Sequence, residues 1–396
     1  MSSVVATTMI FDTKVDEVLK KLIAFDTTSH KSNLDLMAYI QDYLEFFGVK
    51  STLFHNEEKT KANLFAKIAN NASSKHGGIV FSGHTDTVPI TGQNWTKPPY
   101  ELTIENNKFF GRGTADMKSF IALVLAFIPE FVKHKFELPL YLAFSYDEEV
   151  GCVGVRPMLE VLKKQGIQPS LCIIGEPTNL KLVSSHKGKV GFKVEVFGKD
   201  CHSALATQGI NAITYAAKIV NFLQEIAESR CTSGPFDKGF NTPFSTLSVG
   251  TISGGTATNI VPRFCQFVFE FRNIPKDDFV KDLVKLKHFA DKLTQKMQEI
   301  DSSCGIKIKQ TNEYPALEPS NDKQTLALIK RLAVSDTGPN IDFGTEGGLF
   351  KKILGVNSII FGPGSMQQGH KQDEYVTYEQ LKKGEGFFKN FIKEFS

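Results

Sequence analysis

Apolar residues alternate between helical and strand-like spacing through the first half of the chain. Val15, Val18, Leu19, Leu22 and Ile23 recur at helical spacing, which predicts an amphipathic helix near the start. Downstream, short apolar runs typical of buried strands (GGIVFSGHTD, LPLYLAFSYDEE and LCIIGEP) alternate with helical segments (SFIALVLAFIPEF and VRPMLEVLKKQ). This order predicts an α/β fold with a mixed, mostly parallel sheet.

The pattern changes near residue 187. In KVGFKVEVFG, Val190, Phe192, Val194 and Val196 alternate with polar or small residues, as in a half-solvated strand. A helical segment, GINAITYAAKIVNFLQEIA, two strand-like runs, STLSVGTISGG and CQFVFEFRNIP, and a helix over about 277–300 follow. This order predicts an inserted α+β domain of ferredoxin-like type at residues 187–297. It would divide the main domain into segments 1–186 and 298–396, and SIIFGPG would return to the first sheet.

Composition narrows the class of protein. The 46 basic and 43 acidic residues give a net charge of only +3 and form no long basic block, so we expect no nucleic-acid partner. The longest apolar run, FIALVLAFI, is too short to span a membrane, and the start of the chain lacks a secretory signal. Six scattered cysteines form no C-x-x-C pair, which disfavours disulfides and a cysteine zinc site. We therefore expect a soluble, cytoplasmic protein without a membrane partner.

Histidine and acidic residues follow the predicted strands. In a mostly parallel sheet the carboxyl ends of the strands meet at one edge, where ligands collect. Imidazole and carboxylate groups converging there are typical of a divalent metal site. One such residue alone is more often a cap or a satisfied polar group. The set as a whole predicts a metal centre, and its members are His84 and Asp86 in GHTDTVP, Asp116 in GRGTADMK, the adjacent Glu148 and Glu149, Glu176 in GEPT, and His370 in GHKQDEY.

The series GHTDTVP, GRGTADMK, DEEVG, GEPT, CHSA and GPGSMQQGHKQDEY runs through nearly the whole chain in this order. It resembles the zinc-dependent aminoacylase and carboxypeptidase family. The resemblance implies two Zn²⁺ ions, for which Co²⁺ can substitute, in a catalytic domain interrupted by a dimerisation lid. It also implies a homodimer that acts on a small N-acyl amino acid. The metal ligands that it implies are His84 and Glu176 for one ion, His370 and Glu149 for the other, and Asp116 as a bridge between both.

The resemblance also assigns roles beside the metals. Glu148 would be the general base that takes a proton from a water molecule and delivers it to the departing amine. Asp86 would hold the imidazole of His84 in its metal-binding tautomer. The alternative is that Glu148 and Glu149 form ordinary ion pairs on a surface loop.

Further site residues are implied outside the first sheet. His202, in KDCHSALATQGINA, would reach across a dimer to stabilise an oxyanion, or would only begin a helix. Asn259 and Arg272 would bind the oxyanion and a substrate carboxylate, although the glycine pair near Asn259 could be only a tight turn. Glu346, in FGTEGGLF, is predicted to face a cationic substrate side chain, or to cap the helix that follows it.

These observations favour metal-dependent hydrolysis of an N-acylated amino acid. A desuccinylase, a dipeptidase and a broad aminoacylase of the same family are the alternatives. A catalytically inactive binding module would be favoured by a missing ligand or base, and none is missing. The chain has no G-x-S-x-G, G-x-x-x-x-G-K-[ST] or H-E-x-x-H motif, so serine hydrolases, P-loop enzymes and helix-borne zinc proteases lack their signatures.

Overall fold

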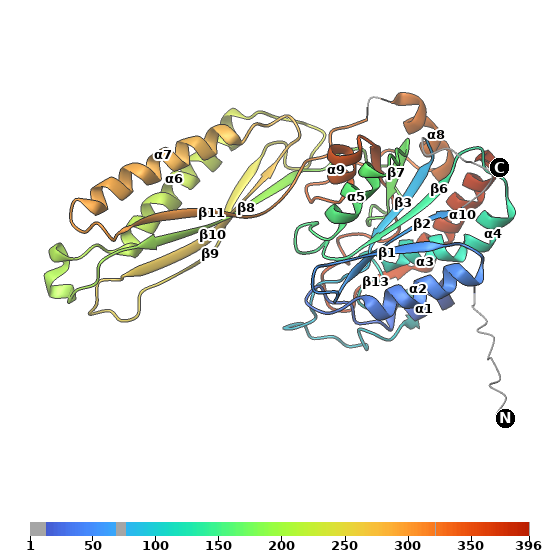
Figure 1. Ribbon diagram of the computed structural model, residues 1–396, viewed down its shortest axis with the longest axis horizontal. Coiled ribbons are helices and arrows are strands. Elements are labelled where there is room, and N and C mark those ends of the chain that lie inside the picture. The colour runs from blue at the N-terminus through green and yellow to red at the C-terminus, as the bar shows by residue number, and fades with distance from the viewer. Residues whose placement is uncertain (1–12, 69–76, 321, 396) are drawn as a thin grey trace. The chain divides into compact units, whose positions relative to one another are not determined.

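The computed structural model describes residues 13–68, 77–320 and 322–395, and the chain divides into two units (Figure 1). The first unit contains the chain up to Ser184, Pro319–Gly338 and the chain from Thr345 onward. The second contains Ser185–Glu318 and Pro339–Gly344. The start of the chain, where a secretory signal was judged absent, lies outside the described residues.

A six-stranded sheet forms the centre of the first unit, with strand order β1-β2-β6-β3-β7-β12. Its strands are β1 (Ser51–His55), β2 (Ala62–Ile68), β3 (Ile79–His84), β6 (Leu140–Ser145), β7 (Leu171–Ile174) and β12 (Asn357–Ile360). Strands β6, β3, β7 and β12 are parallel neighbours, β1 points the same way, and β2 alone runs opposite to the other five strands. The predicted mixed, mostly parallel sheet is therefore confirmed. A small separate sheet contains β4 (Thr103–Glu105), β5 (Lys108–Phe110) and β13 (Tyr375–Thr377).

Helices lie on both faces of this sheet (Figure 1). One face packs against α1 (Val15–Ile23), α2 (Leu34–Phe46), α3 (Lys118–Ala126), α4 (Ile128–Lys133) and α10 (Tyr378–Phe395) in one apolar core, where Phe81 contacts Phe388 edge-on. The other face carries α5 (Val155–Lys164), α9 (Gly347–Leu349) and η2 (Phe350–Leu354), whereas α8 (Lys323–Ala333) packs against α10. The single helix predicted for SFIALVLAFIPEF breaks at Phe127, because Pro129 fits the first turn of a helix better than its interior.

The second unit is an α+β domain with a fully antiparallel sheet of order β11-β8-β10-β9. Its elements follow as β8 (Gly188–Phe197), η1 (Ser203–Gln208), α6 (Ala212–Ser233), β9 (Thr246–Gly254), β10 (Phe264–Asn273), α7 (Val280–Gln298) and β11 (Gly305–Tyr314). This is the predicted ferredoxin-like arrangement. The predicted end at residue 297 is too early, because β11 pairs with β8 and the unit continues to Glu318.

Two expectations from composition can be compared with the structure. In the described part of the chain, no helix combines the length and the apolar character needed to cross a membrane. All six cysteines are free in the structure.

Candidate metal centre

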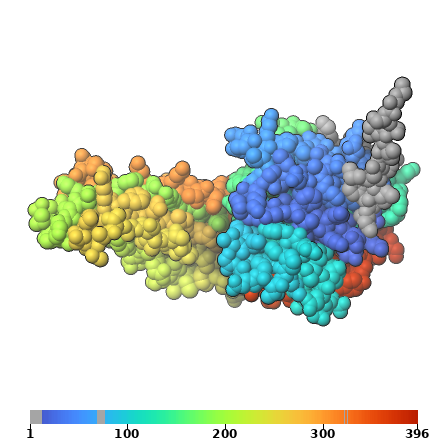
Figure 2. All heavy atoms as spheres, turned by 90° about the horizontal axis from the view of Figure 1, so that it is seen from below, coloured from blue at the N-terminus to red at the C-terminus, as the bar shows by residue number. Residues whose placement is uncertain are grey.

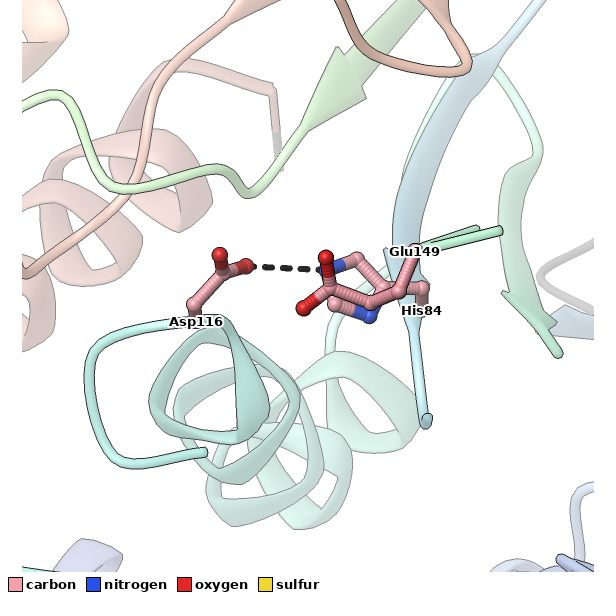
Figure 3. A group of neighbouring side chains, drawn as sticks. All are labelled: His84, Asp116 and Glu149. Atoms are coloured by element: carbon pink, nitrogen blue, oxygen red, sulfur yellow. Dashed lines mark hydrogen bonds and ion pairs between the residues drawn. The ribbon is translucent and has the colours of Figure 1, made fainter. Parts of the chain in front are cut away.

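The sheet brings the strand-end residues together. β3 ends at His84, which pairs in register with Ser145 at the end of β6. Glu148 and Glu149 follow that strand within a few residues, and Glu176 follows the end of β7. Asp116 comes from the loop before α3 and points toward the imidazole of His84 (Figure 3). Parallel strand ends thus supply most of the cluster, as expected for a ligand site in such a sheet.

Asp116 lies between two groups of side chains. Its Oδ1 is 2.9 Å from Nε2 of His84, which is 3.8 Å from Oε1 of Glu176. Its Oδ2 is 3.1 Å from Nε2 of His370, which is 3.0 Å from Oε1 of Glu149. His84, Asp116 and Glu176 are buried. One Asp116 oxygen therefore faces His84 and the other faces His370, with Glu176 on the first side and Glu149 on the second.

The two imidazoles and Asp116 stabilise one another's charged forms. Burial alone would raise the pKa of Asp116, but its hydrogen bonds to His370 and His84 hold that pKa below its ordinary value. Burial alone would lower the pKa of both histidines. The carboxylates overcome this, because Asp116 and Glu176 raise the pKa of His84 and Asp116 and Glu149 raise that of His370 to about 11. The cluster therefore favours positive charge beside Asp116, where a bound cation would take the place of the imidazole protons.

The remaining carboxyl groups of the cluster carry raised pKa values. Burial and the charge of Asp116 raise the pKa of Glu149 to about 7, and burial with the charge of Glu149 raises that of Glu148 to about 8. Burial and Asp116 likewise raise the pKa of Glu176 well above its ordinary value. Four carboxyl groups and two imidazoles therefore share one partly buried space. Nitrogen and oxygen donors with several protons that a cation can displace fit divalent cations such as zinc.

Two overlapping groups of three side chains have possible ligand atoms within 4.8 Å of one another. The first group is His84, Asp116 and Glu149, and the second is His84, Glu148 and Glu176. The second triad includes Glu148, the predicted base. Distances alone therefore allow Glu148 to act as a metal ligand as well as a base.

Asp86 holds the centre in a different way from the one predicted. Its main-chain carbonyl oxygen lies 2.9 Å from Nδ1 of His84, whereas its carboxylate lies 3.6 Å from that nitrogen. The carboxylate instead accepts hydrogen bonds from the backbone N–H groups of Glu148 (3.1 Å) and Glu149 (3.3 Å) and from the Ser29 hydroxyl (2.7 Å). The carbonyl thus sets the His84 tautomer, and the side chain positions the two glutamates.

Cys152 is a neighbour of Glu148 that the motifs did not reveal. Its thiol donates a hydrogen bond to Oε1 of Glu148 at 3.2 Å. Burial raises the pKa of this thiol well above its ordinary value, so it keeps its proton and remains a donor. Only its place four residues after Glu148 could have drawn attention to it.

Glu346 is buried beneath the strand ends. It is 1% exposed, and Oε2 lies 3.5 Å from the Ser82 hydroxyl. Burial raises the pKa of Glu346 to about 7. Its predicted contact with a substrate cation stays a prediction. The alternative, a cap on the following helix, is wrong, because the side chain makes no capping hydrogen bond to α9.

Three predicted site residues belong to the second unit. Nδ1 of His202 accepts a hydrogen bond from the backbone N–H of Ala204 (3.2 Å), so His202 does cap the short η1. Asn259 is exposed, and its carbonyl oxygen accepts the backbone N–H of Ser203 (2.9 Å), which places Asn259 beside His202. Arg272 donates to Glu270 and to the Tyr314 hydroxyl. His202 and Asn259 therefore come together.

The α/β unit carries acidic and histidine side chains at its strand ends, and an α+β unit is inserted into it. This combination is that of a metal-dependent hydrolase. The model of Peptidase family M20/M25/M40 matches residues 80–394, and the chain belongs to this family.

Curated relatives resemble the chain over almost its whole length. Acetylornithine deacetylase of Buchnera aphidicola is 29% identical over 385 residues, covering 96% of this chain and 97% of the relative. The enzyme of the same name from Aliivibrio fischeri is 30% identical over 356 residues, covering 89% of each.

Solved structures share the fold. An M20 family metallo-carboxypeptidase from Sulfolobus solfataricus superposes with a TM-score of 0.78 at 18% identity, covering 97% of this chain and 99% of that chain. A dinuclear metal-binding peptidase of the M20 family from Bacillus subtilis gives a TM-score of 0.59 at 15% identity, covering 96% and 98%.

Proposed function

We propose that this enzyme hydrolyses N2-acetyl-L-ornithine to L-ornithine and acetate, a step of arginine biosynthesis, with two Zn²⁺ ions. The observation that carries the proposal is the position of Asp116, whose two oxygens face two separate His and Glu groups. A shared carboxylate of this kind suits a pair of metal ions. The choice of substrate rests on full-length relatives named acetylornithine deacetylase.

The proposed metal ligands are His84 and Glu176 on one side, His370 and Glu149 on the other, and Asp116 between them. Zinc bound there supplies Lewis acidity toward the amide carbonyl and lowers the pKa of water. The ligands also keep their geometry through the protein, because the Asp86 carbonyl orients the His84 ring.

Glu148 is the proposed general base. It takes a proton from the attacking water and later delivers it to the α-amine of the departing ornithine. Burial and the charge of Glu149 raise the pKa of Glu148 to about 8 in the metal-free cluster, and zinc bound beside it would lower that pKa, so that the carboxylate can accept a proton near neutral pH. Asp86 holds its backbone, and the Cys152 thiol holds Oε1. One carboxylate oxygen therefore has a fixed donor inside the protein, which limits the rotation of the group.

The second unit supports the proposal of a homodimer. Asn259, beside His202, lies just before the start of β10, whereas Arg272 lies near the end of that strand. The strand from its first residue to Arg272 is about 26 Å long, at about 3.3 Å per residue. Residues so far apart in one unit do not reach the same small substrate. We infer that His202 and Asn259 act on the site of a second copy. Because Nδ1 of His202 accepts from Ala204, the neutral ring carries its proton on Nε2 and can donate to an oxyanion.

The zinc-loaded protein is expected to prefer N2-acetylornithine. We expect its kcat/KM to exceed those for N-succinyl-diaminopimelate and a simple dipeptide by at least about 100-fold, because a site that pairs polar substrate groups rejects analogues that leave them unpaired. Release of free amine measures all three reactions. Greater efficiency on the succinyl compound or the dipeptide would assign the enzyme to that activity instead.

Crosswise use of His202 predicts recovery of activity in mixed dimers. Glu148→Gln and His202→Ala should each be nearly inactive alone. Mixed and allowed to exchange subunits, they should regain about one quarter of the wild-type activity per chain, because half of the dimers then contain one intact site of two. Mass spectrometry of differently tagged chains verifies the exchange. Exchange without recovered activity would show that His202 serves its own chain only, as a helix cap does.

A further inference from the structure

Arg112 and Glu374 form an ion pair that is buried on both sides. Each side chain is 1% exposed, and Nη1 of Arg112 lies 2.6 Å from Oε2 of Glu374. A buried ion pair contributes little net stability compared with apolar residues of the same volume. Its presence in the interior therefore calls for another role, and the remaining contacts of both side chains indicate one.

The Glu374 carboxylate binds the backbone of the loop that carries Asp116. Oε1 accepts the N–H groups of Ala115 (2.8 Å) and Asp116 (3.0 Å), and Oε2 accepts that of Gly113 (3.1 Å) besides the guanidinium. Gly113 has a φ of 89°, a conformation that glycine adopts without strain. Three backbone donors thus converge on one buried carboxylate, and they fix the main chain where Asp116 emerges.

Arg112 extends the contacts to the other side of the metal centre. Its Nη2 donates to Oε1 of Gln93 (2.6 Å), and Nε2 of Gln93 donates to the carbonyl oxygen of His370 (2.9 Å). His370 has a φ of 61°, which is uncommon outside glycine and persists only where neighbouring groups hold it. The hydrogen bond from Gln93 is one such restraint. Hydrogen bonds therefore run without a break from the backbone of Asp116 to that of His370.

We propose that Glu374, with Arg112 and Gln93, is a positioning device that sets Asp116 against His370 before metal binds. We call these three residues the clamp. The clamp fixes the backbone segments that carry Asp116 and His370 relative to each other. Because these segments are already ordered, metal binding loses less conformational entropy. It rests on the ligand assignment of the proposed function, and it adds residues that touch neither metal nor substrate.

The chain contains its own reporter of the clamp. Its single tryptophan, Trp95, donates to Oε1 of Gln93 (2.9 Å), and the Arg112 guanidinium lies over its ring at 5.0 Å. The region around residues 90–110, drawn in cyan, forms part of the surface of the first unit (Figure 2). Because Trp95 contacts both Gln93 and Arg112, its fluorescence can follow zinc binding in the intact protein.

The test is a zinc titration of the metal-free protein, followed by Trp95 fluorescence and by competition with a chromogenic zinc chelator. The wild type should bind about two zinc ions per chain. Glu374→Gln keeps the size of the side chain but turns an amide NH₂ toward backbone donors. It should weaken at least one zinc site by about 10- to 100-fold, the usual effect of removing a partner of a metal ligand. Gln93→Ala, at a partly exposed position, should weaken the same site less and is the second variant if Glu374→Gln does not fold.

Asp282→Asn is the matched control, because Asp282 pairs with the partly buried Arg230 in the second unit, which supplies none of the proposed metal ligands. It should lower the melting temperature and leave zinc affinity unchanged. Wild-type zinc affinity in folded Glu374→Gln and Gln93→Ala would overturn the clamp, even if their stability or activity fell. A wild type that binds no zinc would instead contradict the metal centre of the proposed function.

Discussion

Glu148→Gln is expected to lower kcat by about 1,000-fold while the protein retains its zinc, within the range typical of a lost general base. Glutamine has the shape of glutamate, so its amide oxygen can still accept a hydrogen bond from the Cys152 thiol. The backbone N–H of residue 148 can likewise keep its hydrogen bond to the Asp86 carboxylate. It cannot accept a proton from water. Single-turnover kinetics gives the rate, and elemental analysis of the same sample gives the zinc content.

The zinc content decides between the two roles that the distances allow for Glu148. Because Glu148 also lies in a triad with His84 and Glu176, a ligand role predicts that zinc and activity fall together. Asp147→Asn is a suitable control. Asp147 is the preceding residue, but its carboxylate pairs with Lys61 at 2.5 Å. This variant should keep kcat within a few-fold of the wild type, so a loss as large as that of Glu148→Gln would indicate damage to the loop.

Residues at strand ends could be predicted because local pattern and sheet topology act in the same direction. His84 ends β3, a strand buried along its whole length, and the parallel neighbour β6 brings Glu148 and Glu149 to the same edge of the sheet. The partition of the ligands around Asp116 came from the family resemblance and not from spacing. His370 lies far along the chain after β12, and periodicity alone does not place it near Asp116.

The features that the sequence does not predict have physical causes of a different kind. β11 was overlooked because its apolar alternation ends after Ile306 and Ile308, and its pairing with β8 supplies the rest of its stability. Glu346 stands in a glycine-rich segment that resembles a surface turn, yet tertiary packing buries it completely. Glu374 lies inside a quoted motif, GHKQDEY, but its partners are backbone N–H groups more than 250 residues away, as the sequence separation of 258 to Asp116 shows. Such contacts leave no local signal.

Asp116→Ala is expected to have the largest effect on metal content, because it is the one proposed ligand that faces both sides of the centre. One oxygen lies 2.9 Å from the His84 ring and the other 3.1 Å from the His370 ring, so alanine removes a ligand from two ions at once. His84→Ala and His370→Ala should each weaken mainly one ion. Asp116→Ala should bind less than about one zinc per chain after equilibration at a fixed free zinc concentration. Its zinc affinity should fall by more than the roughly 10- to 100-fold expected when an outer partner such as Glu374 is replaced.

Elemental analysis after gel filtration compares the four proteins, and thermal unfolding of their metal-free forms shows whether the fold is intact. The metal-free comparison is informative because, without a cation, hydrogen bonds from both histidines hold the pKa of Asp116 low and Asp116 in turn keeps those rings protonated. In Asp116→Ala the two rings lose this partner, so the His370 pKa should fall from about 11, and NMR titration of the ring can follow it. If Asp116→Ala retained two tightly held zinc ions, Asp116 would not be the shared ligand. The two groups of side chains would then have to hold their ions separately.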